Sequence, residues 1–160
     1  MKKILCCSLI IVLVFSMTAC TDIPVFQEYG IRFNMSPEDV ISRIGEPVEY
    51  DLDDSLTPST HYTFETPVLN QPAVVFCRFY RDKSLHEFRI RWEPETQKQA
   101  DELAAEAEQL IREAYQDHKD FFRTQEENGV SIGIDDGAAG DFYWIRYEDN
   151  QLIVHGIALY

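Results

Sequence analysis

The stretch AVVFCRFYRDKSLHEFRIRW, residues 73–92, decides the fold class. It contains two runs rich in β-branched and aromatic residues, and a polar segment, residues 81–84, separates them. Such a pattern is typical of a β-hairpin. We therefore expect strands over residues 73–80 and 85–92, paired antiparallel.

Two independent patterns predict the register of this hairpin. A two-residue loop of Asp82 and Lys83 sets mostly apolar residues opposite one another on one face. These pairs are Phe79 with His86, Cys77 with Phe88, Val75 with Ile90 and Ala73 with Trp92. The other face then sets Arg78 opposite Glu87, which is a favourable cross-strand pair. Cys77 thus faces the core, where we expect it to act as a small apolar residue.

The segment before the hairpin carries a helix and a strand. In FNMSPEDVISRIGEP, residues 33–47, Ser36 can cap a helix, Pro37 suits its first position and Gly45 its end. A helix is expected over residues 37–44. Residues 51–58 are rich in Asp, Ser and Pro and are interpreted as a loop, and residues 60–65 alternate as a strand.

A longer helix follows the hairpin. Apolar residues recur at steps of three and four between Pro94 and about His118, and they are Ala100, Leu103, Ala104, Ala107, Leu110, Ile111, Ala114 and Tyr115. After a polar stretch, strands are expected over residues 130–134, 142–147 and 152–159, with turns at residues 135–137 and 148–151.

These elements give the order helix-βββ-helix-βββ. Hairpin-linked strands indicate antiparallel pairing, so we predict an α+β fold in which two helices pack on one face of an antiparallel sheet or sheets. Residues 31–160 are long enough for one domain with one core.

The first 20 residues resemble a bacterial lipoprotein leader. Lys2 and Lys3 precede an uncharged apolar run that is shorter than the roughly 20 residues that span a bilayer. Met17-Thr18-Ala19-Cys20 resembles a lipobox, which implies a signal peptide over residues 1–19 and a lipid on Cys20. Residues 20–30 would then tether the domain to the membrane. An ordinary secreted protein is the alternative interpretation.

A family resemblance rests on Met35-Ser36, Val40, Ile44-Gly45 and Pro47. These residues are similar to the Met-Ser/Thr, Val, Leu-Gly-x-Pro signature of the SmpA/OmlA (BamE-type) lipoproteins, over about residues 34–92. The domain of that family resembles each half of β-lactamase inhibitory protein. The resemblance implies helices on an antiparallel sheet and a role in binding other proteins.

The charge of the chain argues against one class of partner, and its cysteine content argues against a disulfide. The chain carries 14 basic and 28 acidic residues, and removal of Lys2 and Lys3 with the leader leaves 12 − 28 = −16. This balance argues against nucleic-acid binding, which needs clustered basic side chains. With Cys20 lipidated, Cys77 is the one thiol left after the leader, so no disulfide is expected within the chain.

The sequence offers weak signals for catalysis or metal binding. Gly129 to Gly133 matches G-x-S-x-G around Ser131, and Asp141 or Asp149 and then His155 follow in hydrolase order. The motif needs a strand–turn–helix elbow, and no helix pattern follows it. Without that helix, we expect no catalytic residue. The histidines are scattered, so we expect no metal site, and the sequence has no P-loop or G-x-G-x-x-G motif, so we expect no cofactor.

The strand FYWIRY, residues 142–147, is apolar on both of its faces. If helices cover one sheet face only, either Phe142 and Trp144 or Tyr143 and Tyr147 face outward. Tyr, Trp and Arg are enriched at binding hot spots, so Tyr143, Trp144, Arg146 and Tyr147 are the candidate binding residues. A central strand covered on both sides is the competing interpretation.

Together these observations predict an extracytoplasmic lipoprotein, held at the cell membrane, or at an outer membrane where one exists, by Cys20. Its domain is expected to bind a protein or peptide of the cell envelope. A small-ligand or carbohydrate sensor is the alternative, and a serine hydrolase through Ser131 comes third.

Overall fold

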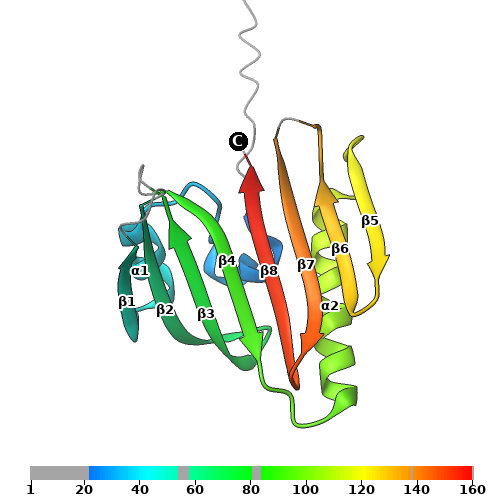
Figure 1. Ribbon diagram of the computed structural model, residues 1–160, viewed down its shortest axis with the longest axis horizontal. Helices are drawn as coiled ribbons and strands as arrows, with labels where there is room; N and C mark the ends of the chain where they lie inside the picture. The colour runs from blue at the N-terminus through cyan, green and yellow to red at the C-terminus, as the bar shows by residue number, and fades with distance from the viewer. Residues whose placement is uncertain (1–21, 54–57, 81–83, 138, 160) are drawn as a thin grey trace, which may run out of the picture.

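The computed structural model describes residues 22–53, 58–80, 84–137 and 139–159. Its main element is one antiparallel sheet of eight strands in the order β1-β2-β3-β4-β8-β7-β6-β5 (Figure 1). The strands are β1 (Glu49–Asp53), β2 (Ser59–Val68), β3 (Gln71–Phe79), β4 (Leu85–Trp92), β5 (Phe121–Glu126), β6 (Gly129–Ile134), β7 (Gly140–Glu148) and β8 (Gln151–Leu159). The helices are the 3-10 helix η1 (Pro24–Tyr29), α1 (Pro37–Ile44) and α2 (Gln97–Tyr115).

Short hairpins build each half of the sheet. The β2–β3 turn places Leu69 and Asn70 at φ values of 54° and 59°, and the β7–β8 turn places Asp149 and Asn150 at 48° and 62°. Two consecutive positive φ values match the twist of the flanking strands, which makes such two-residue turns common in hairpins. Pairing of β4 with β8 then joins the two halves into one sheet.

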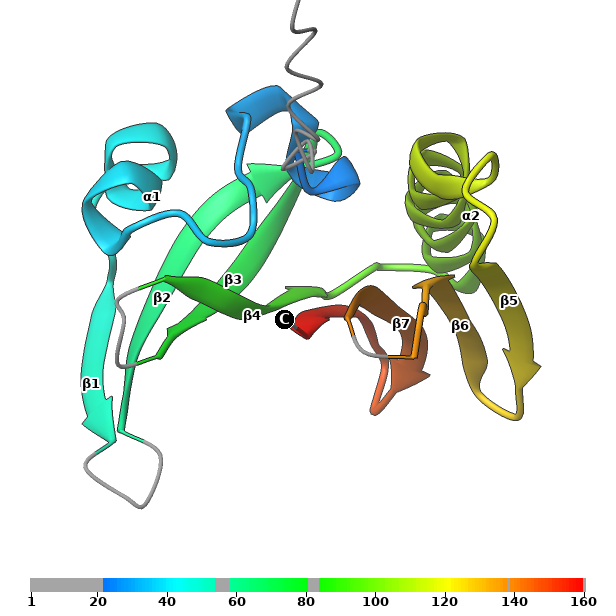
Figure 2. The same ribbon diagram turned by 90° about the horizontal axis from the view of Figure 1, so that it is seen from above.

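The helices lie on one side of the sheet, and the other side is open (Figure 2). Helix α2 contacts β6, β7, β8 and η1, whereas α1 packs less closely on the strands. At the opposite edges of the sheet, the β1–β2 and β5–β6 pairs both extend toward the open side (Figure 2). We call this open side the uncovered face.

The fold predicted from the sequence is therefore wrong in its order and layout. Each helix precedes four strands, not three, and all eight strands form one sheet. The prediction of two helices packed on one sheet face also fails, because α2 packs on the strands of one half, α1 makes few contacts with the strands and the 3-10 helix η1 occupies the middle. The residues interpreted as loop and as a polar stretch contribute the additional edge strands β1 and β5.

Both predicted helices are present with their caps. Ser36 Oγ accepts a hydrogen bond from the amide of Asp39 at 3.1 Å, and α1 has the expected bounds. The side chain of Thr96 accepts from the amide of Gln99 at 3.2 Å and begins α2. Among the described residues, no helix is long and apolar enough to cross a membrane.

The predicted hairpin register is largely confirmed. Cys77 pairs with Phe88, and Arg78 pairs with Glu87. A register shift after Arg78 places Phe79 opposite Leu85 instead of His86, and the turn residues 81–83 lie outside the described part of the chain. Cys77 is fully buried, and burial raises the pKa of its thiol to about 12, as expected of a small core residue.

The predicted tether belongs in large part to the folded domain. Ile23, Val25 and Phe26 are buried, and the amide of Ile23 donates to the carbonyl of Ile31 at 2.7 Å. The apolar residues of this segment fill the space between α2 and the centre of the sheet, so their burial outweighs the freedom of a linker. Folded structure thus begins within three residues of Cys20.

Aromatic rings fill the core beneath the sheet centre. Phe88 contacts Phe26, Phe33 and Tyr143, with ring centroids 5.1, 5.9 and 6.2 Å apart. Tyr115 of α2 donates a hydrogen bond to the Asp141 carboxylate at 2.9 Å, and the hydroxyls of Tyr115 and Tyr143 are also 2.9 Å apart. This network fixes α2 on β7, and it leaves the opposite side of the same strands uncovered.

Candidate functional site

A row of polar and aromatic side chains crosses the middle of the uncovered face. Strand register alone aligns it, because each residue is the Cα partner of the next on five neighbouring strands. The central row consists of Phe76, Arg89, His155, Trp144 and Ser131. Side chains on one face of adjacent strands lie about 5 Å apart, so the row forms one continuous surface.

Glu87 fixes two neighbouring residues of the central row, Arg89 and His155. Its side chain is 9% exposed, and Oε1 lies 2.9 Å from His155 Nε2 and 3.3 Å from Arg89 Nη2. Arg78 Nη1 donates to Oε2 at 3.4 Å. The hydrogen bond from His155, the charges of His155 and Arg89 and the hydrogen bond from Arg78 lower the pKa of Glu87 to about 2 despite its burial. The carboxylate therefore stays ionised and holds three side chains in fixed positions.

Trp144, the next residue of the row after His155, is held between two rings. Its ring stacks on Phe142 with centroids 6.3 Å apart and an interplanar angle of 19°, and it lies 5.3 Å from the His155 ring. A shallow cavity of about 320 Å³ opens beside it, lined by Arg89, Trp144, Arg146, Glu148, Ile153 and His155. An aromatic ring fixed in this way can contact a partner with little loss of side-chain entropy.

Arginines make the centre of this face basic, although the chain as a whole is acidic. Arg89 and Arg146 border the cavity with side chains 55% and 42% exposed. Arg146 reaches Glu148 only at 3.7 Å, and its buried Nε has no hydrogen-bond partner among the described residues. Arg89 also pairs with Glu87, yet the side chains of Arg89 and Arg146 are both exposed enough to contact an acceptor supplied from outside.

The structure separates the four binding residues predicted from the sequence. Trp144 and Arg146 lie on the uncovered face. Tyr143 is fully buried in the aromatic core, and Tyr147 is partly buried against that core. The outward pair is therefore Phe142 and Trp144. Cys20 and the leader lie outside the described residues.

Sequence reasoning missed Arg89, His155 and Glu87 as parts of this surface. A signal for them was available, because Arg89, Arg91 and Glu87 alternate with the core residues of β4. Their proximity to Trp144 depends on the pairing of β4 with β8, which joins residues 60 to 70 positions apart in the chain. The sequence pattern of one strand does not reveal that pairing.

The residues of the possible hydrolase motif do not come together. Ser131 lies on β6 and donates to the Glu126 carboxylate, while His155 lies two strands away on β8 and bonds to Glu87. Asp141 is on the helix side of the sheet, where Tyr115 binds it. Asp149 lies in the β7–β8 turn. The motif sits on a strand and not on a strand–turn–helix elbow.

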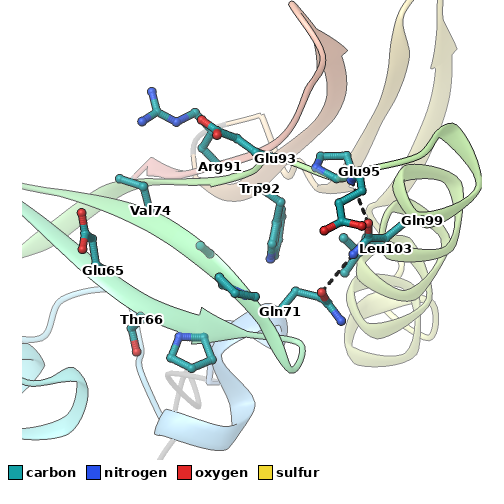
Figure 3. A pocket seen from close by; sticks show the side chains of 14 residues that line it. Glu65, Thr66, Gln71, Val74, Arg91, Trp92, Glu93, Glu95, Gln99 and Leu103 are labelled. Carbon is teal, nitrogen blue, oxygen red and sulfur yellow. Dashed lines mark hydrogen bonds between the residues drawn. The ribbon is translucent and has the colours of Figure 1, made fainter.

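A second, larger cleft of about 510 Å³ lies where β3 and β4 separate (Figure 3). Pairing ends at Val74 and Arg91, so the expected Ala73–Trp92 pair is absent from the register. The Trp92 indole enters the gap and donates to the carbonyl of Val68 at 3.1 Å. The cleft mixes carboxylates, amides and prolines around this buried ring, and we find no cluster of catalytic groups in it.

No group of three or more metal-ligating side chains occurs in the described part of the chain. No protein-family model, curated protein or solved structure matches the chain. The resemblance to the SmpA/OmlA lipoproteins stays a hypothesis that rests on its short motif.

Proposed function

We propose that this chain is a membrane-anchored extracytoplasmic lipoprotein whose uncovered sheet face binds a protein or peptide of the cell envelope. The observation that carries the binding proposal is the row of Trp144, His155 and Arg89 across an otherwise open sheet. Tyr, Trp and Arg dominate binding hot spots because they combine large apolar area with hydrogen bonding.

The breadth of the surface favours a macromolecule over a small ligand. Pockets for small molecules are concave and bury most of the ligand, whereas the central row spreads over five strands beside one shallow cavity. The exposed guanidinium groups of Arg89 and Arg146 further favour a segment that carries a carboxylate next to an apolar side chain.

Anchoring rests on the sequence of the leader. Folded structure begins at about Ile23, only three residues after Cys20, and three residues span at most about 11 Å. A lipid on Cys20 would therefore hold the domain close to the membrane surface and limit the partner to the envelope.

Alanine variants of Trp144 and Arg146 test the binding proposal. Because both side chains are partly exposed, Trp144→Ala should shift the melting temperature little and lower co-purification of the partner from detergent-solubilised membranes at least tenfold. Arg112→Ala, on the outer surface of α2, is the matched control for Arg146→Ala and should leave binding unchanged. Unchanged co-purification with Trp144→Ala, or a sugar as the bound species, would contradict the proposal.

A further inference from the structure

The outer edge of strand β1 is a second exposed surface, and no other strand of the described structure pairs with it. β1 pairs only with β2, so one edge of its backbone faces away from the sheet in the described structure. An open strand edge can accept another strand through main-chain hydrogen bonds, and proteins usually protect such edges against unwanted pairing.

Apolar side chains remain exposed along this strand. Four large apolar side chains are more than half exposed in the described residues. Three of them alternate here at 55% exposure each: Val48 just before β1, and Tyr50 and Leu52 within it. Tyr50 contacts the partly buried Tyr62 of β2, with ring centroids 5.1 Å apart, which extends the apolar area inward. An alternating apolar row on an edge strand is a ready surface for one more strand.

Acidic side chains occupy the other face of the same strand. They are Glu49, Asp51 and Asp53, opposite Thr63, His61 and Ser59 of β2. Asp53 lies 4.0 Å from Arg78, whereas Glu49 and Asp51 form no ion pair among the described residues. Two unneutralised carboxylates thus remain along the open edge.

The charges decide which strand can pair here. A second copy of β1 added antiparallel would set acidic side chains against acidic ones on one face, and like charges directly opposite are destabilising. A strand with basic residues on that face would instead place opposite charges together, while its apolar residues meet Val48, Tyr50 and Leu52 on the other face.

We propose that β1 is a strand-addition site for an extended segment that alternates basic and apolar residues. The acidic side of β1 borders the Phe76 end of the central row, because Glu49, Asp51 and Phe76 line one pocket. The open edge itself lies five strands from β7, which carries Trp144, and neither proposal depends on the other. Main-chain hydrogen bonds supply the pairing, and the alternating side chains of β1 set its register and its preference for positive charge.

The test uses two designed β-hairpin peptides whose outer strands alternate valine with lysine or valine with glutamate. A preformed hairpin lowers the ordering cost of binding. The proposal expects the lysine peptide to bind at least tenfold more tightly than the glutamate peptide. Backbone amide NMR shifts should concentrate in β1, and the affinity should fall with added salt.

A charge-reversed variant makes the test independent of folding. Glu49→Lys with Asp51→Lys should reverse the preference, because the acidic row becomes basic while the apolar row stays intact. A reversal of preference cannot arise from loss of structure. Arg146→Ala is the control for the other surface and should leave binding of the lysine peptide unchanged.

Removal of the charges gives a second readout. Glu49→Thr with Asp51→Thr should promote self-association through β1, measured by analytical ultracentrifugation, because the repulsion between copies is then reduced. The proposal is overturned if neither peptide shifts β1, if the charge-reversed variant keeps the original preference, or if the unmodified chain already dimerises through β1.

Discussion

Glu87 shows how one residue can prepare the surface that its neighbours present. It is nearly buried, yet it accepts hydrogen bonds from His155, Arg89 and Arg78. Because these interactions favour its ionised form, the pKa of Glu87 falls from an ordinary value of 4.5 to about 2. The carboxylate therefore stabilises the folded state and also fixes the orientation of two residues of the central row, Arg89 and His155.

This linkage predicts a specific pH dependence of stability. A lowered folded-state pKa gives stabilisation that is complete above about pH 4.5 and is lost as the pH falls toward 2. At pH 7 the free energy of unfolding of the Glu87→Gln variant should be lower than that of the unmodified chain by on the order of 2 kcal/mol. This is less than the free energy that corresponds to the whole pKa shift, because solvent screens the partly exposed arginines. Denaturant unfolding at several pH values measures it, and the gap to the unmodified chain should close between pH 4.5 and 2. A gap independent of pH would contradict this account.

Individual residues also mark the limit of sequence reasoning about the site. Strand alternation predicts that either Trp144 or Tyr143 faces outward, but it does not select the side. Selection depends on where α2 docks, because Tyr115 of α2 meets Tyr143 and Asp141 through hydrogen bonds. A hydroxyl contact between residues 28 positions apart is not visible in the local pattern of either segment.

At the scale of the elements, the helices and strands that could be predicted are those with a clear pattern of apolar residues or capping residues in their own sequence. Strands β3 and β4, with long apolar alternation, and both capped helices were predictable. Residues 51–53 of β1 resemble a loop in the sequence because their acidic side chains and the following Ser and Pro outweigh the alternation of Tyr50 and Leu52. β5 resembles a polar loop in the sequence because only its first two residues are apolar. It is a strand because the chain turns back directly after it and pairs it with β6. Edge strands lack the burial that makes central strands recognisable.

A substitution at Gly156 of β8 tests how closely the side chains of β4 and β7 pack against this strand. A Cβ atom at this position would lie 2.3 Å from the Phe88 ring, and that ring is enclosed by Phe26, Phe33 and Tyr143. Gly156→Ala should therefore destabilise the domain by about 1–3 kcal/mol through overpacking, more than the roughly 0.4–1 kcal/mol that alanine gains in the unfolded chain. Thermal and denaturant unfolding give the measurement.

Coupling to Phe88 is the control for that prediction. Phe88→Leu combined with Gly156→Ala should cost less than the sum of the two single changes, because the smaller side chain leaves room for the new methyl group. Strictly additive costs would show that the ring does not restrict this position.

At the scale of the whole molecule, a basic and aromatic face is displayed by an acidic chain with a net charge of −14. Acidic surroundings limit nonspecific contact with anionic lipid headgroups, while the arginines concentrate at the centre of the uncovered face. The proposed anchor would add proximity, since a lipid-held domain meets its partner at the membrane surface.

The anchor leads to a prediction about Cys20. Cys20→Ser should move the protein from the membrane fraction to the soluble extracytoplasmic fraction, because two or more acyl chains at about 0.8 kcal/mol per CH₂ group would otherwise hold it. Fractionation and intact-mass analysis are the measurements. Cys7→Ser, which changes another leader cysteine, is the matched control and should stay in the membrane fraction. An unacylated mature chain from the unmodified protein would contradict the lipoprotein assignment.

The central claim, that the uncovered face around Trp144 binds a protein partner, is tested most directly by photo-crosslinking in intact cells. A benzoylphenylalanine residue is introduced in place of Trp144 or Phe76 on that face, and in place of Lys98, which is 85% exposed on α2, as the control. The account predicts one discrete protein adduct shared by positions 144 and 76 and absent from position 98. Adducts of equal yield at all three positions, or none at position 144, would contradict it.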